Sequence, residues 1–388
     1  MTSASARVLA VVGTRPEAIK MAPVVDALRA RADEVELRVV LTGQHTTLVD
    51  QALETFGLDP DYDLGIMSEN QSLYDVAHGC LSGLRRVVED SRPDAMLVQG
   101  DTATVCFGAL VAHFERVQVG HVEAGLRSHD KWAPFPEELF RRISDAASDW
   151  HFAPTGGAAA NLEAEGVPRT GIHVTGNTVV DALLCAADVP HAVEDPELAS
   201  ALREERRLVL VTAHRRESFG TPLRRALGAV RTLADEHDDI VIVYPVHPNP
   251  SVRSVAQELL ADHPRIRLTD PVGYLDLVAA LRHAALVLTD SGGIQEEAPT
   301  FATPVLVMRE VTERPEGIEA GVAELVGTDP ERILGRARSV LEGSWNATGA
   351  NPYGDGRAGE RVADIVIADL TGAARRTRDL APAGARMA

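Results

Sequence analysis

The sequence has few cysteines and no long apolar run. Its three cysteines, Cys80, Cys106 and Cys185, are odd in number and show no CxxC spacing, which excludes a disulfide framework and a cysteine zinc site. No apolar run reaches the roughly 18 residues of a membrane-spanning helix, and the first apolar stretch covers only Val8 to Val12. We therefore expect a cytoplasmic protein without a signal peptide or membrane helix.

The sequence also has fewer basic than acidic residues. The chain has 38 Lys and Arg against 57 Asp and Glu, a net charge of −19. This charge repels polyanions and argues against nucleic acid or an acidic membrane as the main partner, so an anionic small ligand needs a local basic site. The 45% hydrophobic and 24% charged content is that of a globular protein. At about 100–200 residues per domain, 388 residues predict two domains.

Short runs rich in Val, Ile and Leu recur in both halves, with amphipathic stretches between them. Those runs are Arg7–Val12, Val35–Thr42, Ala95–Gln99 and Val117–Val122, then Arg207–Thr212, Ile240–Tyr244, Leu286–Asp290 and Pro304–Met308. Apolar strands that alternate with helices are typical of parallel sheets, so we predict an α/β protein. We place an N-terminal domain at 1–176, a C-terminal domain at 177–365, and a C-terminal helix or tail at 366–388, which we expect to pack on the N-terminal domain.

Each half begins with a strand that ends in a cationic turn and leads into a helix, in GTRPEAIK and TAHRRES. Ligands of open parallel sheets bind beyond the carboxyl ends of strands. We therefore expect the cations of both turns to face one cleft between the halves; they are Arg15, Lys20, His214, Arg215 and Arg216. Taken singly, Arg15 and Lys20 are also explained as solvated residues at a helix start.

The segment VLTDSGGIQEEA predicts a strand, a glycine turn and a helix start. Ser291, Gly292 and Gly293 would present free backbone N–H groups to a phosphate at the positive end of the helix dipole. Glu297, one turn later, is suited to accept hydrogen bonds from a ribose. Gly-Gly turns are common, and the GxGxxG and GxxxxGK[ST] spacings are absent, so neither a dinucleotide fingerprint nor a P-loop is supported.

Three acidic residues, Asp101, Glu123 and Glu137, lie at or after predicted strand ends. Carboxylates in a partly desolvated cleft act as general acids or bases. The alternative for each is a surface charge or a helix cap, the latter especially for Asp101. His214 and His247 also follow strand ends, but no HxxxH or HExxH spacing occurs, so we expect no metal site.

Eleven motifs in chain order, from about Gly13 to Gly356, closely resemble those of the non-hydrolysing UDP-N-acetylglucosamine 2-epimerases. They are GTRPEAIKMAPVV, TGQH, VQGDTATV, HVEAGLRS, PFPEE, HFAPT, VTGNTVVDAL, VTAHRRE, VHPNP, TDSGGIQEEAP and NPYGDG. The resemblance implies two Rossmann-like domains in a glycosyltransferase-B-like arrangement, with the active site in the interdomain cleft. It also implies reversible conversion of UDP-GlcNAc to UDP-ManNAc without metal or cofactor, through elimination of UDP to a 2-acetamidoglucal and its re-addition.

The resemblance assigns roles by motif. It makes Asp101, Glu123 and Glu137 the acid and base candidates, without saying which one takes the C2 proton. Active-site roles also fall to the residues Lys20, Arg141 and His214. The UDP-sugar would be bound by Arg15, His247, Tyr274, Ser291, Gly292, Gly293, Glu297 and Arg314.

The chain departs from the family pattern at three positions. Phe140 stands where the family usually has an asparagine. A second, activating UDP-GlcNAc site of many bacterial members is matched at Gln44 and Arg215, but Thr47 and Asn70 replace a glutamine and an arginine. Because a lost cation removes a charge-assisted contact to a diphosphate, we expect weak or absent activation by UDP-GlcNAc.

Three other functions remain open from the sequence. A hydrolysing epimerase would release N-acetylmannosamine and UDP; fused members of that branch carry a kinase domain, which nothing in this sequence indicates. A glycosyltransferase of the same fold has no need of the three acidic residues in the first half. A binding protein without catalysis would not need them either. The resemblance also implies a homodimer.

Overall fold

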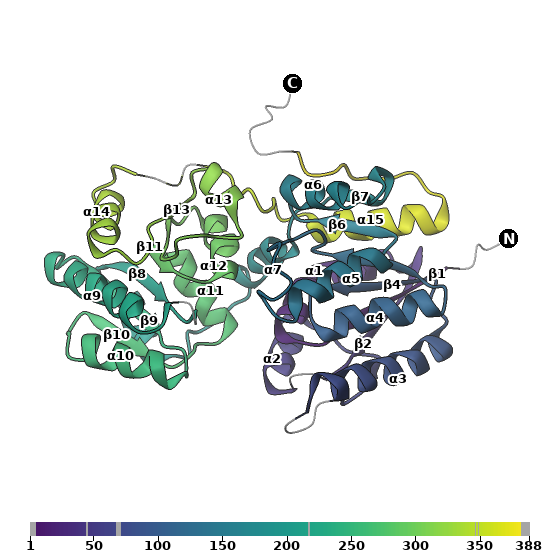
Figure 1. Cartoon of the computed structure of the whole chain (residues 1–388), viewed down its shortest axis with the longest axis horizontal. Coiled ribbons are helices and arrows are strands. Elements are labelled where there is room, and N and C mark those ends of the chain that lie inside the picture. The colour runs from purple at the N-terminus through teal and green to yellow at the C-terminus, as the bar shows by residue number, and fades with distance from the viewer. Residues whose placement is uncertain are drawn as a thin grey trace. The chain divides into compact units, whose positions relative to one another are not determined.

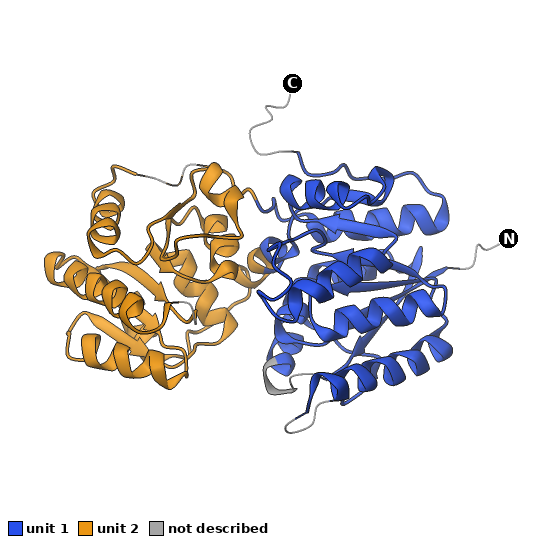
Figure 2. Cartoon of the chain, viewed as in Figure 1, with its two compact units in different colours: residues 1–182, 353–388 blue, residues 183–352 orange. Residues whose placement is uncertain are grey.

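The computed structural model describes residues 5–43, 46–66, 71–215, 218–345, 347 and 349–381, with only the backbone described for 46–48. These residues form two compact units (Figure 2). Unit 1 contains residues 1–182 and 353–388, and unit 2 contains residues 183–352. The last helix of the chain therefore belongs to the same unit as its first strand.

Unit 1 is built on a parallel sheet with strand order β3-β2-β1-β4-β5-β6-β7 (Figure 1). Its strands are β1 (Ala6–Val12), β2 (Val35–Leu41), β3 (Tyr62–Asp63), β4 (Ala95–Gln99), β5 (Gln118–Val122), β6 (Trp150–Ala153) and β7 (Ile172–Val174). Its helices are α1 (Arg15–Arg29), α2 (Thr46–Phe56), α3 (Leu73–Ser91), α4 (Ala103–Phe114), α5 (Glu137–Ala147), α6 (Gly156–Ala164), η1 (Arg169–Gly171) and α15 (Ala358–Thr371), together with the first half of α7 (Thr178–Ala187).

Unit 2 has a parallel sheet with strand order β10-β9-β8-β11-β12-β13. Its strands are β8 (Arg207–Thr212), β9 (Ile240–Pro245), β10 (Ile266–Thr269), β11 (Ala284–Thr289), β12 (Val305–Val307) and β13 (Ala323–Leu325). Its helices are α8 (Pro196–Arg203), α9 (Thr221–Glu236), α10 (Pro250–Leu260), α11 (Tyr274–His283), α12 (Gly292–Glu297), η3 (Ala298–Phe301), α13 (Pro315–Glu319) and α14 (Pro330–Leu341). The expected α/β class with parallel sheets is confirmed.

The central strands of both sheets are apolar on both faces because helices cover both. In unit 1, Leu9 and Val11 of β1 join Met96 and Val98 of β4 in one buried cluster. In unit 2, a buried cluster contains alternate residues of β8 and β11 together with the apolar side of α9. These cores hold the central strands rigidly, so the turns at their carboxyl ends are fixed in place.

Strand order reverses at one point in each sheet. In unit 1 the reversal lies between β1 and β4, and in unit 2 between β8 and β11. In open parallel sheets, ligands bind at such reversals, beyond the carboxyl ends of the strands. The cationic turns singled out in the sequence follow β1 and β8, so both lie at these reversals.

The two units divide at different places from the predicted boundaries at 176/177 and 365/366. The division falls inside α7, because Val179 and Val180 pack against Tyr353 within unit 1. The returning chain joins unit 1 at Tyr353. The helix α15, which begins at Ala358, then packs on α1 of the same unit. A Cβ on Gly359 would lie 2.5 Å from the carbonyl oxygen of Pro23, so only glycine permits this approach of α15 to α1.

Candidate active site

Two turns of unit 1 carry predicted site residues at the sheet reversal. Arg15 and Lys20 lie on α1, which follows β1, and Asp101 lies between β4 and α4. Because β1 and β4 pair in parallel, these turns meet at one edge of the sheet. The N-cap of α4 is Thr102, so the capping role considered for Asp101 is wrong.

Glu123 follows β5 in a left-handed backbone conformation, with φ of 70°, which residues other than glycine rarely adopt. Its side chain is 7% exposed. Lys20 Nζ donates a hydrogen bond to Glu123 Oε1 at 2.6 Å, and Asn177 Nδ2 donates to the same oxygen at 3.2 Å. Gln99 Nε2 donates to Oε2. Donors from three elements thus hold a carboxylate in a place with little water, as acid or base chemistry requires.

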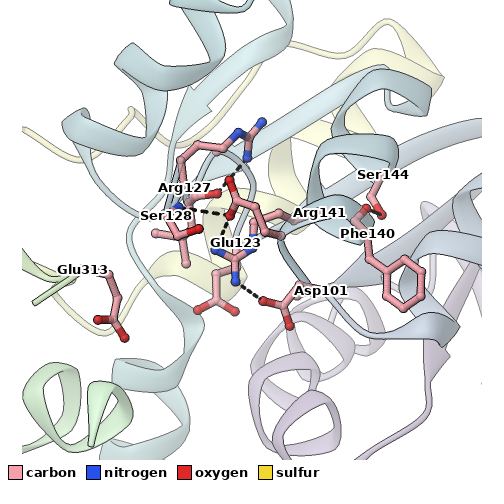
Figure 3. Close-up of polar contacts among 12 residues, drawn as sticks. Asp101, Glu123, Arg127, Ser128, Phe140, Arg141, Ser144 and Glu313 are labelled. Atoms are coloured by element: carbon pink, nitrogen blue, oxygen red, sulfur yellow. Dashed lines mark hydrogen bonds and ion pairs between the residues drawn. The ribbon is translucent and has the colours of Figure 1, made fainter. Parts of the chain in front are cut away.

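Asp101 is paired with Arg141, whose Nη2 donates to Asp101 Oδ2 (Figure 3). The other terminal nitrogen of Arg141 donates to Glu138 Oε2 at 3.2 Å. Glu138 is fully buried and also accepts hydrogen bonds from the backbone N–H groups of Ser128, at 3.0 Å, and His129, at 3.2 Å. Glu138 therefore fixes the guanidinium that contacts Asp101, and sequence reasoning did not single it out.

The two glutamates of the PFPEE motif have different surroundings. Glu138 is buried, as described, whereas Glu137 begins α5 with a half-buried side chain. Phe140, one turn later, packs edge-to-face on Phe107 of α4, with ring centroids 5.9 Å apart. The side chain that replaces the family's asparagine thus joins the apolar packing between α5 and α4.

A buried network supports both carboxylate-bearing turns. His121 Nδ1 lies 2.6 Å from Asp145 Oδ1, and its Nε2 lies 2.7 Å from the carbonyl oxygen of Gly100. Burial alone would lower the pKa of His121, but these two acceptors outweigh burial and raise it. Asp145 Oδ2 accepts from Arg127 Nη2 at 2.7 Å and from Gly125 N at 3.3 Å. Since Gly100 follows β4 and Gly125 follows β5, the network fixes both turns.

Glu17 on α1 joins the turns after β1 and β4, and it too was missed from the sequence. Its side chain is buried, its Oε2 accepts from Gly13 N at 2.6 Å and Thr14 N at 3.3 Å, and its Oε1 accepts from Thr102 Oγ1 at 2.6 Å. Burial raises the pKa of Glu17 to about 7, although all these donors lower it. Ionising Glu17 therefore opposes folding.

We expect Glu17→Gln to flatten the pH dependence of stability. The glutamate pKa is 4.5 when unfolded and about 7 when folded, so wild-type stability falls as pH rises through this window. The cost is complete above pH 7 and amounts to about 3 kcal/mol at 1.36 kcal/mol per pKa unit. Urea unfolding at pH 5 and pH 8 measures most of it: because part of the cost is already present at pH 5, wild type should lose about 2–3 kcal/mol more than the variant. Equal losses would show that Glu17 is not buried as an ionisable group. The control is Glu89→Gln, at an exposed position of α3.

In unit 2, the turns after β8 and β11 are joined by Asp290. Its Oδ2 accepts from the backbone N–H groups of His214 and Arg215, both at 2.8 Å, and its Oδ1 lies 3.3 Å from His214 Nδ1. The His214 ring stacks on His247, which follows β9, with centroids 5.7 Å apart. Burial lowers the pKa of His214, and the nearby Arg215 and His247 lower it further. Asp290 raises this pKa, but the other effects are larger. A neutral His214 at pH 7 is therefore available to donate or accept a proton.

Arginines surround the start of α12. Arg215 Nη2 lies 3.3 Å from Glu313 Oε1, and Arg309 Nη1 donates to Glu313 Oε2 at 2.6 Å. A Cβ on Gly292 would lie 3.1 Å from Glu313 Oε1, so this carboxylate sits against the glycine turn. Burial would raise the pKa of Glu313, but the neighbouring arginines hold it below its ordinary value. The surroundings of Gly292 thus favour a negative group.

The glycine turn itself differs in one respect from the prediction. The backbone N–H of Ser291 was expected to be free, but it donates to Thr289 Oγ1 at 2.9 Å. Arg314, predicted for the nucleotide side, pairs through Nε with the buried Glu296. Gly293 lies inside the first turn of α12.

Of the remaining predicted residues, the structure describes some and not others. Tyr274 begins α11 with a partly buried side chain, and Glu297 ends α12. The second-site residues Gln44 and Asn70, the cation Arg216 and the side chain of Thr47 lie outside the described residues.

Several partners of the site escaped sequence reasoning although signals were present. Asp290 directly follows β11, so the rule that selected Asp101 also applied to it. Glu17 and Asn177 lie inside motifs quoted above, but Thr102, which donates to Glu17, and Glu123, which accepts from Asn177, come from distant segments. Asn177 in particular follows the short strand β7, which the hydrophobic pattern did not indicate.

Among the described residues, no group of three or more His, Cys, Asp or Glu side chains has the arrangement of a metal site. In the same part of the chain, no helix is long and apolar enough to cross a membrane.

Solved structures share this architecture. The UDP-GlcNAc 2-epimerase of Neisseria meningitidis, solved bound to UDP-GlcNAc, has a TM-score of 0.83 and 38% identity, covering 93% of this chain and 99% of that one. The enzyme of Methanocaldococcus jannaschii, in complex with UDP-GlcNAc and UDP, has a TM-score of 0.76 and 33% identity, with coverage of 93% and 99%. A glycotransferase of kitacinnamycin, 14% identical with a TM-score of 0.60, shares the fold alone. The expected glycosyltransferase-B-like fold class is confirmed.

Sequence comparison gives the same family. The UDP-N-acetylglucosamine 2-epimerase of Bacillus subtilis is 44% identical over 365 residues, which cover 93% of this chain and 95% of that protein. The enzyme of the same name from Escherichia coli K12 is 45% identical over 371 residues, with coverage of 93% and 98%. A family model described as UDP-N-acetylglucosamine 2-epimerase matches residues 26–367. The chain therefore belongs to the UDP-N-acetylglucosamine 2-epimerase family.

Proposed function

We propose that the protein interconverts UDP-GlcNAc and UDP-ManNAc by inverting the configuration at C2 of the sugar. Membership of the family supports this reaction, as do two relatives solved with UDP-GlcNAc bound. The observation that carries the proposal for this chain is the setting of Glu123, a carboxylate 7% exposed and held by Lys20, Gln99 and Asn177. A binding protein would have no use for a carboxylate prepared in this way.

The reaction that these residues suit is an elimination followed by an addition. A carboxylate takes the C2 proton, the C1–O bond breaks, and its electron pair leaves with the β-phosphate oxygen of UDP, which creates a C1=C2 double bond. UDP then adds back at C1 while a proton is delivered to the opposite face of C2. Two acid or base groups on different sides of the sugar are needed, and Asp101, Glu123 and Glu137 are the candidates.

The departing UDP carries negative charge that cations and backbone N–H groups stabilise. In the proposal, the diphosphate binds at the glycine turn of unit 2, where Gly292 and Gly293 begin α12 and Arg215 and Arg309 supply positive charge. Glu297 would accept from the ribose. The other proposed contacts to UDP are His214, His247, Tyr274, Ser291 and Arg314.

We expect Arg15→Ala to weaken UDP binding. A cation that faces the diphosphate acts in the ground state and the transition state alike, so both KM and the Kd of UDP should rise. One lost charge-assisted hydrogen bond corresponds to roughly 10–100-fold in affinity. Isothermal titration with UDP measures the change, with Arg29→Ala at the far end of the same helix as the control. Unchanged UDP affinity in Arg15→Ala would place Arg15 outside the binding site.

Product analysis tests the proposed function. Purified protein is incubated with UDP-GlcNAc without added metal or nicotinamide, and the products are separated by anion exchange. UDP-ManNAc at equilibrium with UDP-GlcNAc is expected. Free N-acetylmannosamine with UDP would assign the hydrolysing reaction instead, and UDP binding without any product would assign a binding role.

The cellular setting of the enzyme is also a proposal. We propose a homodimer in the cytoplasm that acts on a nucleotide sugar and has neither nucleic acid nor a membrane as its partner. The net charge of −19 supports the exclusion of both polyanionic surfaces.

A further inference from the structure

Asn177 is 1% exposed and is held through both its side chain and its backbone. Its Nδ2 donates to Glu123 Oε1 at 3.2 Å, and its Oδ1 accepts from the backbone N–H of Val179 at 3.1 Å. Its own backbone N–H donates to the carbonyl oxygen of Tyr353 at 2.6 Å. A carboxylate requires a donor and an N–H requires an acceptor, so the two ends of the amide are chemically assigned.

The same residue lies where the chain leaves and re-enters unit 1. The division into units falls after Ala182, and the chain returns at Tyr353. Tyr353 is 1% exposed, and its neighbour Gly354 is packed so closely that a Cβ would lie 3.3 Å from Val180 Cβ and 3.4 Å from the carbonyl oxygen of Asn177. The returning segment at Tyr353 and Gly354 thus contacts the backbone of Asn177 and the side chain of Val180.

We propose that Asn177 is a positioning residue that orients the carboxylate of Glu123, and that the returning segment at Tyr353 holds Asn177 in place. The inference rests on the proposed function, because the orientation of Glu123 matters only if its carboxylate reacts.

The other groups that face Glu123 have different tasks. Lys20, from α1, supplies the opposite charge through a long side chain that has many rotamers. Gln99, at the end of β4, holds the other oxygen. The amide of Asn177 is short and is fixed at both ends, so it limits the direction in which Oε1 points.

The test is Asn177→Asp, which keeps the shape, the acceptor for Val179 and the backbone bond to Tyr353. The introduced carboxyl donates to Glu123 only while it is protonated, and the two carboxyls titrate as a coupled pair. At pH 8–9 both are ionised, and we expect kcat to fall roughly 10–100-fold as Glu123 is displaced. As pH decreases, the ratio of variant to wild-type kcat should recover, while the Kd of UDP stays at the wild-type value throughout.

Asn161→Asp is the matched control. Asn161 on α6 is partly buried and donates through Nδ2 to the carbonyl oxygen of Gly125 at 2.9 Å, so its amide contacts a carbonyl and not Glu123. If the loss in Asn177→Asp came only from a weakened fold, Asn161→Asp should show a similar fall of kcat at pH 8–9. A pH-independent ratio for Asn177→Asp, or a kcat equal to wild type at pH 9, would overturn the inference.

Gly354→Ala tests the link to the returning segment, because its new methyl presses on Val180 and Asn177. We expect a lower kcat with unchanged UDP affinity, and a wild-type kcat would refute the link.

The variant Glu123→Gln distinguishes failure of this inference from failure of the proposed function. If that variant is inactive while Asn177→Asp is wild-type, only the inference fails. If wild type makes no UDP-ManNAc, the proposed function itself fails.

Discussion

Replacing Glu123 by glutamine is expected to lower kcat by about 10²–10⁴, the usual contribution of a positioned general acid or base. Glutamine has nearly the same shape but cannot take a proton from C2 or return one. UDP affinity should be retained, because the proposed UDP contacts lie mainly on unit 2, whereas Glu123 is held within unit 1. Asp101→Asn and Glu137→Gln should cause losses in the same range if those residues also transfer protons.

The three variants can be distinguished by following exchange of the C2 proton with solvent as well as turnover. The variant that lacks the base loses both exchange and epimerisation. Thermal unfolding of each variant shows whether the fold is intact. Full activity in any one of them would remove that carboxylate from the mechanism.

Asp145→Asn is expected to destabilise unit 1 by about 3–5 kcal/mol, the cost of removing one partner from a buried ion pair. His121 is fully buried, the Arg127 side chain is 1% exposed, and both donate to Asp145. Burial would raise the pKa of Asp145, but these two neighbours keep it below its ordinary value, so the carboxylate is ionised at neutral pH. The amide carries no charge, so the Arg127 guanidinium and the His121 ring lose the carboxylate that they share.

Glu165→Gln is the matched control for Asp145→Asn. Glu165 pairs with the same Arg127 but is 32% exposed, so its loss should cost less than about 1 kcal/mol. Urea unfolding is followed by the fluorescence of Trp150, which is buried in β6, in a chain with Trp132→Phe and Trp345→Phe. Equal effects of the two variants would mean that the buried network does not stabilise unit 1.

The strands nearest the two reversals could be predicted from the sequence, whereas β6 and the edge strands could not. Strands β1 and β8 are apolar on both faces and differ by at most one residue from the predicted runs. Strands β7 and β13 have three residues each, and β3 has two, so their hydrophobic pattern is too short to recognise. Their positions depend on pairing with a neighbour, which is tertiary information.

The positions of the candidate residues after strand ends could be predicted from the sequence, whereas their contacts could not. The turns at Asp101 and His214 lie at the sheet reversals, as general rules for parallel sheets require. The pairing of Lys20 with Glu123 joins residues 103 positions apart, and that of Glu123 with Asn177 joins residues 54 apart. No local pattern encodes such pairs. The prediction that the backbone N–H of Ser291 is free was wrong for a similar reason, because this N–H donates a hydrogen bond to the side chain of Thr289.

The measurement that tests the proposed reaction most directly is epimerisation in D₂O followed by proton NMR. UDP-GlcNAc is incubated with the protein without added metal or nicotinamide, with Glu123→Gln run in parallel. We expect UDP-ManNAc with deuterium at C2, formed by wild type and strongly reduced in the variant. UDP-ManNAc that keeps its original C2 proton would contradict proton transfer by carboxylates of unit 1, and the absence of any UDP-ManNAc would contradict epimerisation.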